Sequence, residues 1–311
     1  MIVDVKKDFG CVGDGVALDG ANFQRAISAV MVSPYGGGRV FVPAGRYNLA
    51  GGIIVPSNVW LEGEQRNCSI LQSLDHDGVV VTVGGGSPKL TDLTILGRGA
   101  DGMALATRHA LVVNSVEGIF RDILIAGGAS AIYAAGVDNT FENIKATQGT
   151  GRALVTSVGA DWYVRCKFDA APGWQQQVAG ISFLDGAGEN HLTQIDLSGS
   201  FVNSIEFDAG PRADTPPIVV IGDSIMSAGV TLIRGEWFCM HHCELGGGDV
   251  AVNPSYAGGV TIDGNRALSP VRILIGSSLC RGVIANNDLP GSLIRQQALN
   301  TSLVMGGQNL I

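Results

Sequence analysis

The sequence predicts an all-β protein: a parallel β-helix in which one chain winds repeatedly and stacks strand on strand, with a helix covering its N-terminal end. Three observations predict this fold. Of 311 residues 45 are glycine, 46% are hydrophobic and only 15% are charged, a composition that suits many short strands joined by tight turns. A short strand signature recurs along the chain. One amphipathic segment, residues 22–32, precedes most of these strands.

The amphipathic segment is the only strong helix signal. Phe23, Ala26, Ile27 and Val30 recur at helical spacing and would form one apolar face. A single helix cannot bury that face alone, whereas a solenoid needs a terminal cap over its open core. We therefore expect the helix to cap the first coil, and Asp19 to cap the helix N-terminus with its side chain.

The strand signature has a polar residue or glycine, an inward residue, an outward residue and then usually another inward apolar one. Hairpin sheets would instead show turns every eight to twelve residues. The intervals between the first inward positions are 19 to 34 residues, clustering near 22 and 29, which fits one coil with loops of variable length. These positions are Val40, Val59, Leu93, Ile123, Ile144, Cys166, Ile195, Ser224, Cys243, Asn265 and Asn287.

The recurrence defines three predicted segments. Residues 1–36 form the N-terminal cap, residues 37–291 form a β-helix of about eleven coils, and residues 292–311 cap the far end or contact another subunit. Near the end of the series, Asn265 and Asn287 occupy the inward position. Stacked asparagines can bond one another, so we expect a buried amide ladder there.

Charge and composition exclude several classes of function. The net charge of −8 disfavours a nucleic-acid partner, and no apolar run is long enough to span a membrane. The six cysteines show no disulfide framework. The run from Cys239 to Cys243 contains two histidines, but alternation along a strand would point Cys239, His241 and Cys243 to one face and His242 to the other. We favour a structural role for the cysteines and expect no metal and no cofactor.

Two segments resemble the start of a known family. The run Asp8-Phe9-Gly10-Cys11-Val12-Gly13-Asp14-Gly15 and the run from Gly37 to Tyr47, GGRVFVPAGRY, flank the predicted helix. Together they resemble the start of the pectate-lyase-superfamily right-handed β-helix, found in bacteriophage tailspikes, polygalacturonases and mannuronan epimerases. The resemblance implies a right-handed coil and, from the tailspikes, a homotrimer. Members often carry paired aspartates after Gly-Asp-Gly. Only Asp19 follows here, so no catalytic residue is carried over.

The outward positions suggest one acid–base constellation. Asp196, Asp223 and Glu244 occupy consecutive coils, and His242 lies beside Glu244. Parallel strands are about 4.8 Å apart, so carboxylates on adjacent or alternate coils lie about 5 or about 10 Å apart, which brackets retaining and inverting glycoside hydrolysis. We expect Glu244 or Asp196 to act as the acid and Asp223 as the base or nucleophile, with His242 orienting the reacting groups. The competing interpretation is a solvated, mixed-charge surface.

Substrate-binding candidates surround this constellation. Lys167 and Arg266 flank the carboxylates, and Trp162, Trp174 and Trp237 are candidate platforms for sugar rings. Packing in the core or in loops would explain the tryptophans equally well.

These observations favour a virion-associated, tailspike-like protein that binds and hydrolyses a bacterial surface polysaccharide and contacts other virion tail proteins. One alternative is a non-enzymatic β-helix that adheres to cells or builds the particle. Another is a bacterial polysaccharide lyase or epimerase. A calcium-assisted lyase would need clustered aspartates and a basic arginine or lysine. The chain shows no signal peptide, so we expect it in the virion, or else secreted without one.

Overall fold

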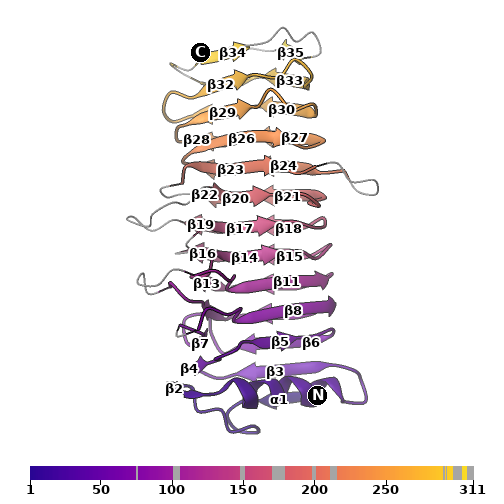
Figure 1. The fold of residues 1–311 in the computed structure, drawn as a ribbon, viewed down its shortest axis with the longest axis vertical. Coiled ribbons are helices and arrows are strands. Elements are labelled where there is room, and N and C mark those ends of the chain that lie inside the picture. Colours follow the sequence, from indigo (N-terminus) through magenta and orange to yellow (C-terminus); the bar gives the residue numbers. More distant parts are fainter. Residues whose placement is uncertain are drawn as a thin grey trace. The chain divides into compact units, whose positions relative to one another are not determined.

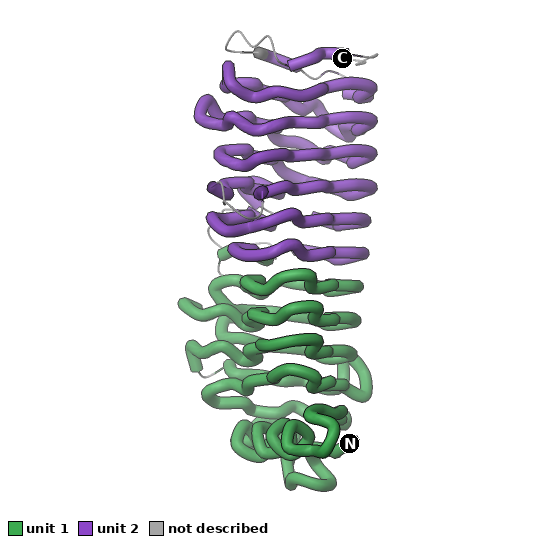
Figure 2. The backbone as a smooth tube through the Cα atoms, turned by 90° about the vertical axis from the view of Figure 1, so that its right-hand side faces the viewer, with its two compact units in different colours: residues 1–154 green, residues 155–311 purple. Residues whose placement is uncertain are grey.

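The computed structural model describes residues 1–74, 76–100, 106–147, 151–169, 179–197, 201–210, 216–289, 291, 293–296 and 303–306. The chain divides into two compact units, residues 1–154 (unit 1) and residues 155–311 (unit 2), coloured separately in Figure 2. The predicted division at residues 36 and 291 stays a prediction. None of the helices in the described part is long and apolar enough to cross a membrane.

The fold is a right-handed parallel β-helix, which confirms the predicted fold class. Each unit contains three parallel sheets, here named A, B and C, and the chain visits them in turn to complete one coil (Figure 1). The next coil lays its strands in register on those of the coil before. Each strand is stacked on the equivalent strand of the coil before, which explains why the strand signature recurs at intervals of one whole coil.

Unit 1 begins with the capping helix and the first strands. Sheet A contains β1 (Ile2–Asp4), β3 (Gly38–Val42), β6 (Val59–Gly63), β9 (Lys89–Thr91), β12 (Ile119–Arg121) and β15 (Thr140–Glu142). Sheet B contains β2 (Asp14–Leu18), β4 (Gly45–Asn48), β7 (Ser69–Gln72), β10 (Thr94–Leu96), β13 (Leu124–Ala126) and β16 (Lys145–Thr147). Sheet C contains β5 (Ile53–Val55), β8 (Val81–Gly86), β11 (Leu111–Val116) and β14 (Ser130–Ala134). The boundary between the units falls within β17 (Arg152–Thr156).

Unit 2 repeats the same coil. Sheet A contains β18 (Trp162–Val164), β21 (Glu189–Thr193), β24 (Ile218–Gly222), β27 (Trp237–His241), β30 (Gly259–Asp263), β33 (Arg281–Ala285) and β35 (Leu303–Gly306). Sheet B contains β19 (Lys167–Asp169), β22 (Asp196–Leu197), β25 (Ile225–Met226), β28 (Glu244–Leu245) and β31 (Arg266–Ala267). Sheet C contains β20 (Ala179–Phe183), β23 (Asn203–Asp208), β26 (Gly229–Arg234), β29 (Asp249–Val252), β32 (Arg272–Ile275) and β34 (Leu293–Gln296).

The capping helix α1 (Gly20–Met31) starts two residues earlier and ends one residue earlier than predicted. Its four predicted apolar residues are all buried, so the expected packing face is confirmed. The role expected for Asp19 was wrong. This residue precedes the helix, but its carboxylate accepts no helix N–H and instead accepts the backbone N–H groups of Val12 (2.7 Å) and Gly13 (3.0 Å). Asp19 therefore fixes the turn before β2.

The signature marks the corner between sheets A and B. From Leu93 onward, the inward residue sits at this corner, and the residue before it adopts the left-handed conformation that bends the chain from sheet A into sheet B. Every predicted inward position is buried. The alignment of Val40 and Val59 with the others was wrong, because both lie inside sheet A strands, where Val40 pairs with Leu61 and Val59 with Gly38. The left-handed corner residues are Asp92, Asp122, Asn143, Arg165, Gln194, Asp223, His242, Gly264 and Asn286.

The predicted amide ladder is confirmed in unit 2. Asn265 donates a side-chain hydrogen bond to the amide oxygen of Asn287 (3.0 Å), and both side chains are buried. The same oxygen accepts the backbone N–H of Asn265, and the oxygen of Asn265 accepts the N–H of Cys243. The ladder therefore satisfies buried polar groups of the corner itself.

Candidate functional site

The corner between sheets A and B of unit 2 carries a row of polar and titratable side chains. Five of the six coils from Arg165 onward place a polar side chain at the left-handed position, outside the core, and Gly264 occupies that position in the remaining coil. The five polar residues are Arg165, Gln194, Asp223, His242 and Asn286. Such a backbone conformation is uncommon for residues other than glycine, asparagine and aspartate. A row of polar side chains therefore follows this edge of unit 2.

Four side chains near the middle of this row form what we call the imidazole–carboxylate cluster: Asp223, His241, His242 and Asp263. Nδ1 of His242 lies 3.9 Å from Oδ1 of Asp223, and more than half of each side chain is exposed. The rings of His241 and His242 meet edge to face with centroids 5.3 Å apart. Register places His241 directly beside Asp263, the last residue of the next sheet A strand.

A glycine makes room for this cluster. Gly222 pairs with His241 across adjacent strands, and a Cβ at Gly222 would lie 2.5 Å from Cε1 of the His241 ring. Any larger residue at this position would displace the imidazole. On the other side, Oδ1 of Asp263 accepts a hydrogen bond from Nδ2 of Asn286 (2.9 Å).

The predicted carboxylates lie where the signature placed them. Asp196, Asp223 and Glu244 fall on three consecutive coils. In sheet B, Ile225 separates Asp196 from Glu244. Asp196 and Glu244 are therefore two strands apart, about 10 Å, while Asp223 lies on the coil between them. These separations suit acid–base chemistry on a sugar. The catalytic roles stay predictions.

The flanking cations differ in their partners. Lys167 donates a hydrogen bond of 2.8 Å to Oδ2 of Asp196, and this bond raises the pKa of the Lys167 ammonium. Arg266 pairs with Glu244 in the sheet B register, and its side chain is exposed. Asp196 thus has one oxygen engaged, whereas Glu244 makes no side-chain ion pair in the part of the chain that the structure describes.

The three tryptophans predicted to bind sugar differ in their exposure and contacts. Trp162 is 50% exposed and stacks on His191 with centroids 4.2 Å apart, and Nε2 of His191 lies 2.8 Å from Oε1 of Glu189. Trp237 is half-buried and lies flat against Gly259, where a Cβ would clash with its ring. Trp174 lies outside the described residues. Trp162 is therefore the tryptophan best placed to offer a ring face to a ligand.

Sequence reasoning missed His241, Asp263 and the pairing of His191 with Trp162. The strand alternation assigned to residues 239–243 was wrong, because the left-handed turn at His242 interrupts it: Cys239 and His241 face outward, while Cys243 enters the core. Burial raises the pKa of the Cys243 thiol to about 12, so that thiol stays protonated. Within the described residues, no group of three or more His, Cys, Asp or Glu side chains could hold a metal ion.

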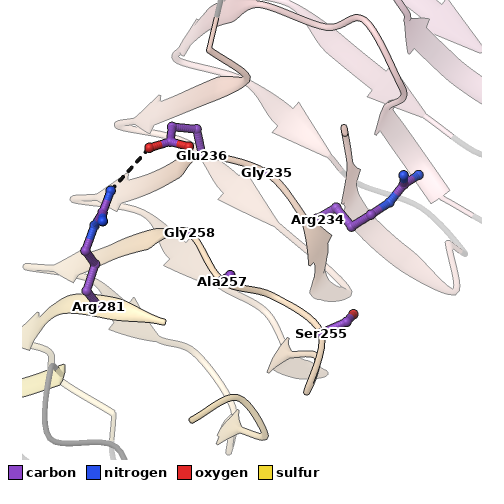
Figure 3. A pocket seen from close by; sticks show the side chains of 7 residues that line it. All are labelled: Arg234, Gly235, Glu236, Ser255, Ala257, Gly258 and Arg281. Atoms are coloured by element: carbon purple, nitrogen blue, oxygen red, sulfur yellow. Dashed lines mark hydrogen bonds and ion pairs between the residues drawn. The ribbon is translucent and has the colours of Figure 1, made fainter. Parts of the chain in front are cut away.

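A separate hollow of about 270 Å³ lies at the corner between sheets C and A of unit 2. Gly235, Ala257 and Gly258 lie between its charged walls, as Figure 3 shows. Arg281 bonds Glu236 at 3.2 Å. On the other wall, Arg234 bonds Asp208 at 2.5 Å and Asp185 at 3.1 Å. Both guanidinium groups are thus engaged by carboxylates, and this hollow contains none of the predicted site residues.

Comparison with known proteins finds one family model that matches the N-terminal sequence. Residues 2–76 match the family described as rhamnogalacturonase A/epimerase, pectate lyase-like. Over 76 residues, 22% of this chain, the sequence is 38% identical to mannuronan C5-epimerase AlgE5 of Azotobacter vinelandii. The matched stretch makes up only 7% of that epimerase.

The fold is similar to two solved structures over nearly the whole chain. The A-module of Azotobacter vinelandii mannuronan C-5 epimerase AlgE4 matches with a TM-score of 0.64 at 15% identity, covering 98% of this chain and 100% of the module. The Dettilon tailspike protein matches with a TM-score of 0.59 at 13% identity, covering 97% of this chain and 70% of the tailspike chain. Both proteins thus share the parallel β-helix fold with this chain. The N-terminal sequence is thus pectate lyase-like, and the fold is the right-handed parallel β-helix that the resemblance implied.

Proposed function

We propose that this β-helix binds a bacterial surface polysaccharide along the sheet A–sheet B corner of unit 2 and hydrolyses it there. The observation that carries the proposal is the pairing of Asp223 with His242, both exposed, with Asp196 and Glu244 on the coils to either side. A glycosidase needs two carboxylates at such separations and a surface that the polymer can reach.

Each side chain has a role in this proposal. Glu244 is the better candidate for the acid, because Lys167 already donates to one oxygen of Asp196. Asp223 serves as base or nucleophile on the coil between them, and His242 orients it from 3.9 Å. Arg266 and Lys167 contact the hydroxyl or anionic groups of neighbouring sugars. Trp162 supplies a ring face on which a sugar can stack.

The fold shared with the Dettilon tailspike protein supports a place in a phage particle. On this proposal the chain is a homotrimeric virion component that contacts other tail proteins and is released with the virion. The non-enzymatic counterpart, an adhesin, would use the same surface to hold the glycan without cleaving it.

A second function is favoured by the N-terminal match and by the fold shared with the AlgE4 A-module. In a C5-epimerase or lyase, one group removes the proton beside a sugar carboxylate. The imidazole–carboxylate cluster contains two histidines and two carboxylates that can remove and return protons. This cluster therefore suits either reaction class, and the products distinguish them.

The test is incubation of the purified full-length chain with a panel of capsular polysaccharides, lipopolysaccharides and mannuronan. Hydrolysis yields new reducing ends, lyase action yields unsaturated products that absorb in the ultraviolet, and epimerisation in D₂O yields deuterium at C5 without chain shortening. We expect new reducing ends, with Asp223→Asn and Glu244→Gln each lowering turnover by about 10²–10⁴-fold.

Asp249→Asn is the matched control, because this sheet C carboxylate only pairs with Arg272 at the surface. Full turnover by the Asp223 and Glu244 variants would contradict the assigned site. Capture of intact glycan with no product would favour the adhesin. Deuterium at C5 would favour the epimerase.

A further inference from the structure

The outer face of sheet A in unit 1 holds a hollow of about 390 Å³. Three consecutive strands, β3, β6 and β9, bring Arg39, Trp60 and Lys89 into register, so the indole lies between two cationic side chains. Asn58 and Ser87 complete the polar lining. We call this hollow the Trp60 pocket.

The indole of Trp60 is held in place. Its Nε1 donates a hydrogen bond of 3.0 Å to Oγ1 of Thr91. The Arg39 guanidinium lies 5.0 Å from the ring centroid of Trp60 and forms an ion pair with Glu62, which neutralises its charge. A ring fixed in this way loses little entropy when a ligand stacks on it.

Lys89 and Asn58 are available for a ligand. The Lys89 side chain is exposed, and within the described residues its ammonium has no ion pair or hydrogen bond. Asn58 is exposed at a left-handed backbone position, and its side-chain amide likewise has no partner in the described part. Ser87 bonds Glu117 at 3.3 Å and is already satisfied. The uncompensated groups of the pocket are therefore one cation and one amide beside a rigid aromatic ring.

We propose that the Trp60 pocket is a second saccharide-binding site, which takes a sugar ring that carries a negatively charged substituent. The apolar face of the sugar stacks on the indole, a hydroxyl bonds the Asn58 amide, and the charged group pairs with Lys89. This site lies in unit 1 and goes beyond the chemistry proposed for unit 2. It would hold the polymer whether or not the chain cleaves it.

The test monitors Trp60 directly. The full-length chain is labelled with 5-fluorotryptophan, and the Trp60 ¹⁹F resonance is assigned with Trp60→Phe. Trigalacturonate, sulfated maltotriose and maltotriose are then titrated. We expect a saturable shift of the Trp60 resonance with the first two probes, weakened by salt, and none with neutral maltotriose. A difference between the first two probes tells whether carboxylate or sulfate is the preferred anion.

Lys89→Gln should weaken trigalacturonate binding at Trp60 roughly three- to tenfold, and Lys89→Glu should abolish it. Lys145→Gln is the matched control, an exposed lysine on sheet B of the same unit, and should leave the affinity unchanged. Asp223→Asn should also leave it unchanged, so failure of the site in unit 2 is seen separately. Three outcomes would overturn the proposal: no Trp60 shift at millimolar saccharide, an equal response to maltotriose, or an equal loss in Lys145→Gln.

Discussion

The two units share one coil design but place different residues at the corner between sheets A and B. In unit 1 the inward corner residues are Leu93, Ile123 and Ile144, which bury only hydrocarbon. In unit 2 the same position holds Cys166, Ile195, Ser224 and Cys243 before it ends in the amides of Asn265 and Asn287. At the left-handed position of that corner, unit 1 has only Asp and Asn, whereas unit 2 has Arg, Gln, Asp, His, Gly and Asn in turn.

The difference shows what a stacked coil permits. A buried polar side chain is costly without a partner, but in a solenoid the neighbouring coil can supply one. The buried hydroxyl oxygen of Ser224, for example, accepts the backbone N–H of Ile195 one coil earlier (3.0 Å). The interior can therefore become polar without losing its packing, provided that successive coils change together. The exposed corner position has no such constraint, so a single coil of unit 2 can place a histidine or an aspartate there.

The largest expected effect compares the aromatic cores of the two units. Phe207 in unit 2 has Phe183, Phe238 and Tyr256 around it at centroid distances of 6.1 to 6.4 Å. In unit 1, Phe120 stacks on Phe141 at 4.8 Å. Truncation to alanine removes buried surface and leaves a cavity, so each variant should lose about 3–5 kcal/mol of unfolding free energy, with Phe207→Ala losing more.

Urea unfolding of the two variants measures this difference, and Phe207→Leu and Phe120→Leu serve as controls that keep most of the volume. An equal or larger loss in Phe120→Ala would show that stacking in unit 1 contributes at least as much as the aromatic contacts around Phe207 in unit 2.

The next effect isolates the amide ladder. Asn265→Ala removes the acceptor of the Cys243 N–H and leaves the Asn287 amide oxygen with one donor fewer. A buried group left unpaired costs about 1–3 kcal/mol, so we expect a loss of that size. The double variant Asn265→Leu/Asn287→Leu should lose less than the sum of its single variants, because it removes both partners. If urea unfolding showed that the loss of the double variant equals the sum of the losses of its single variants, the two asparagines would not be coupled.

Much of the fold could be predicted from the sequence because the corner between sheets A and B restricts which residue types can occupy it. A left-handed residue followed by a buried one recurs once per coil, and Asp92 before Leu93 or Asn143 before Ile144 shows it directly. The rule failed for the first coils. Asn58 is also left-handed, but it precedes a sheet A strand instead of following one, so Val59 was aligned with the wrong corner.

The candidate site was less accessible to sequence reasoning. Spacing alone put Asp196 and Glu244 two coils apart, as observed. The position of the His241 ring depends on Gly222, which comes nineteen residues earlier and becomes its neighbour only through strand register. The stack of Trp162 on His191 likewise joins residues of adjacent coils. Contacts across coils depend on exact loop lengths, which composition and periodicity do not fix.

The smallest expected effect concerns a half-buried histidine of unit 1, in contrast to the exposed His242 of unit 2. His109 stacks on Tyr133 with centroids 4.7 Å apart, and burial, aided by the charge of Arg108, lowers the pKa of its imidazole. Between that lowered pKa and the unfolded value of about 6.5, the unfolded chain binds more protons than the folded one. The unfolding free energy should therefore rise with pH through this window and fall as the solution is acidified.

Urea unfolding across the window should show this slope for the wild type, a shallower slope for His109→Gln and an intermediate slope for Arg108→Gln. An unchanged slope in His109→Gln would assign the pH dependence to the carboxylates instead.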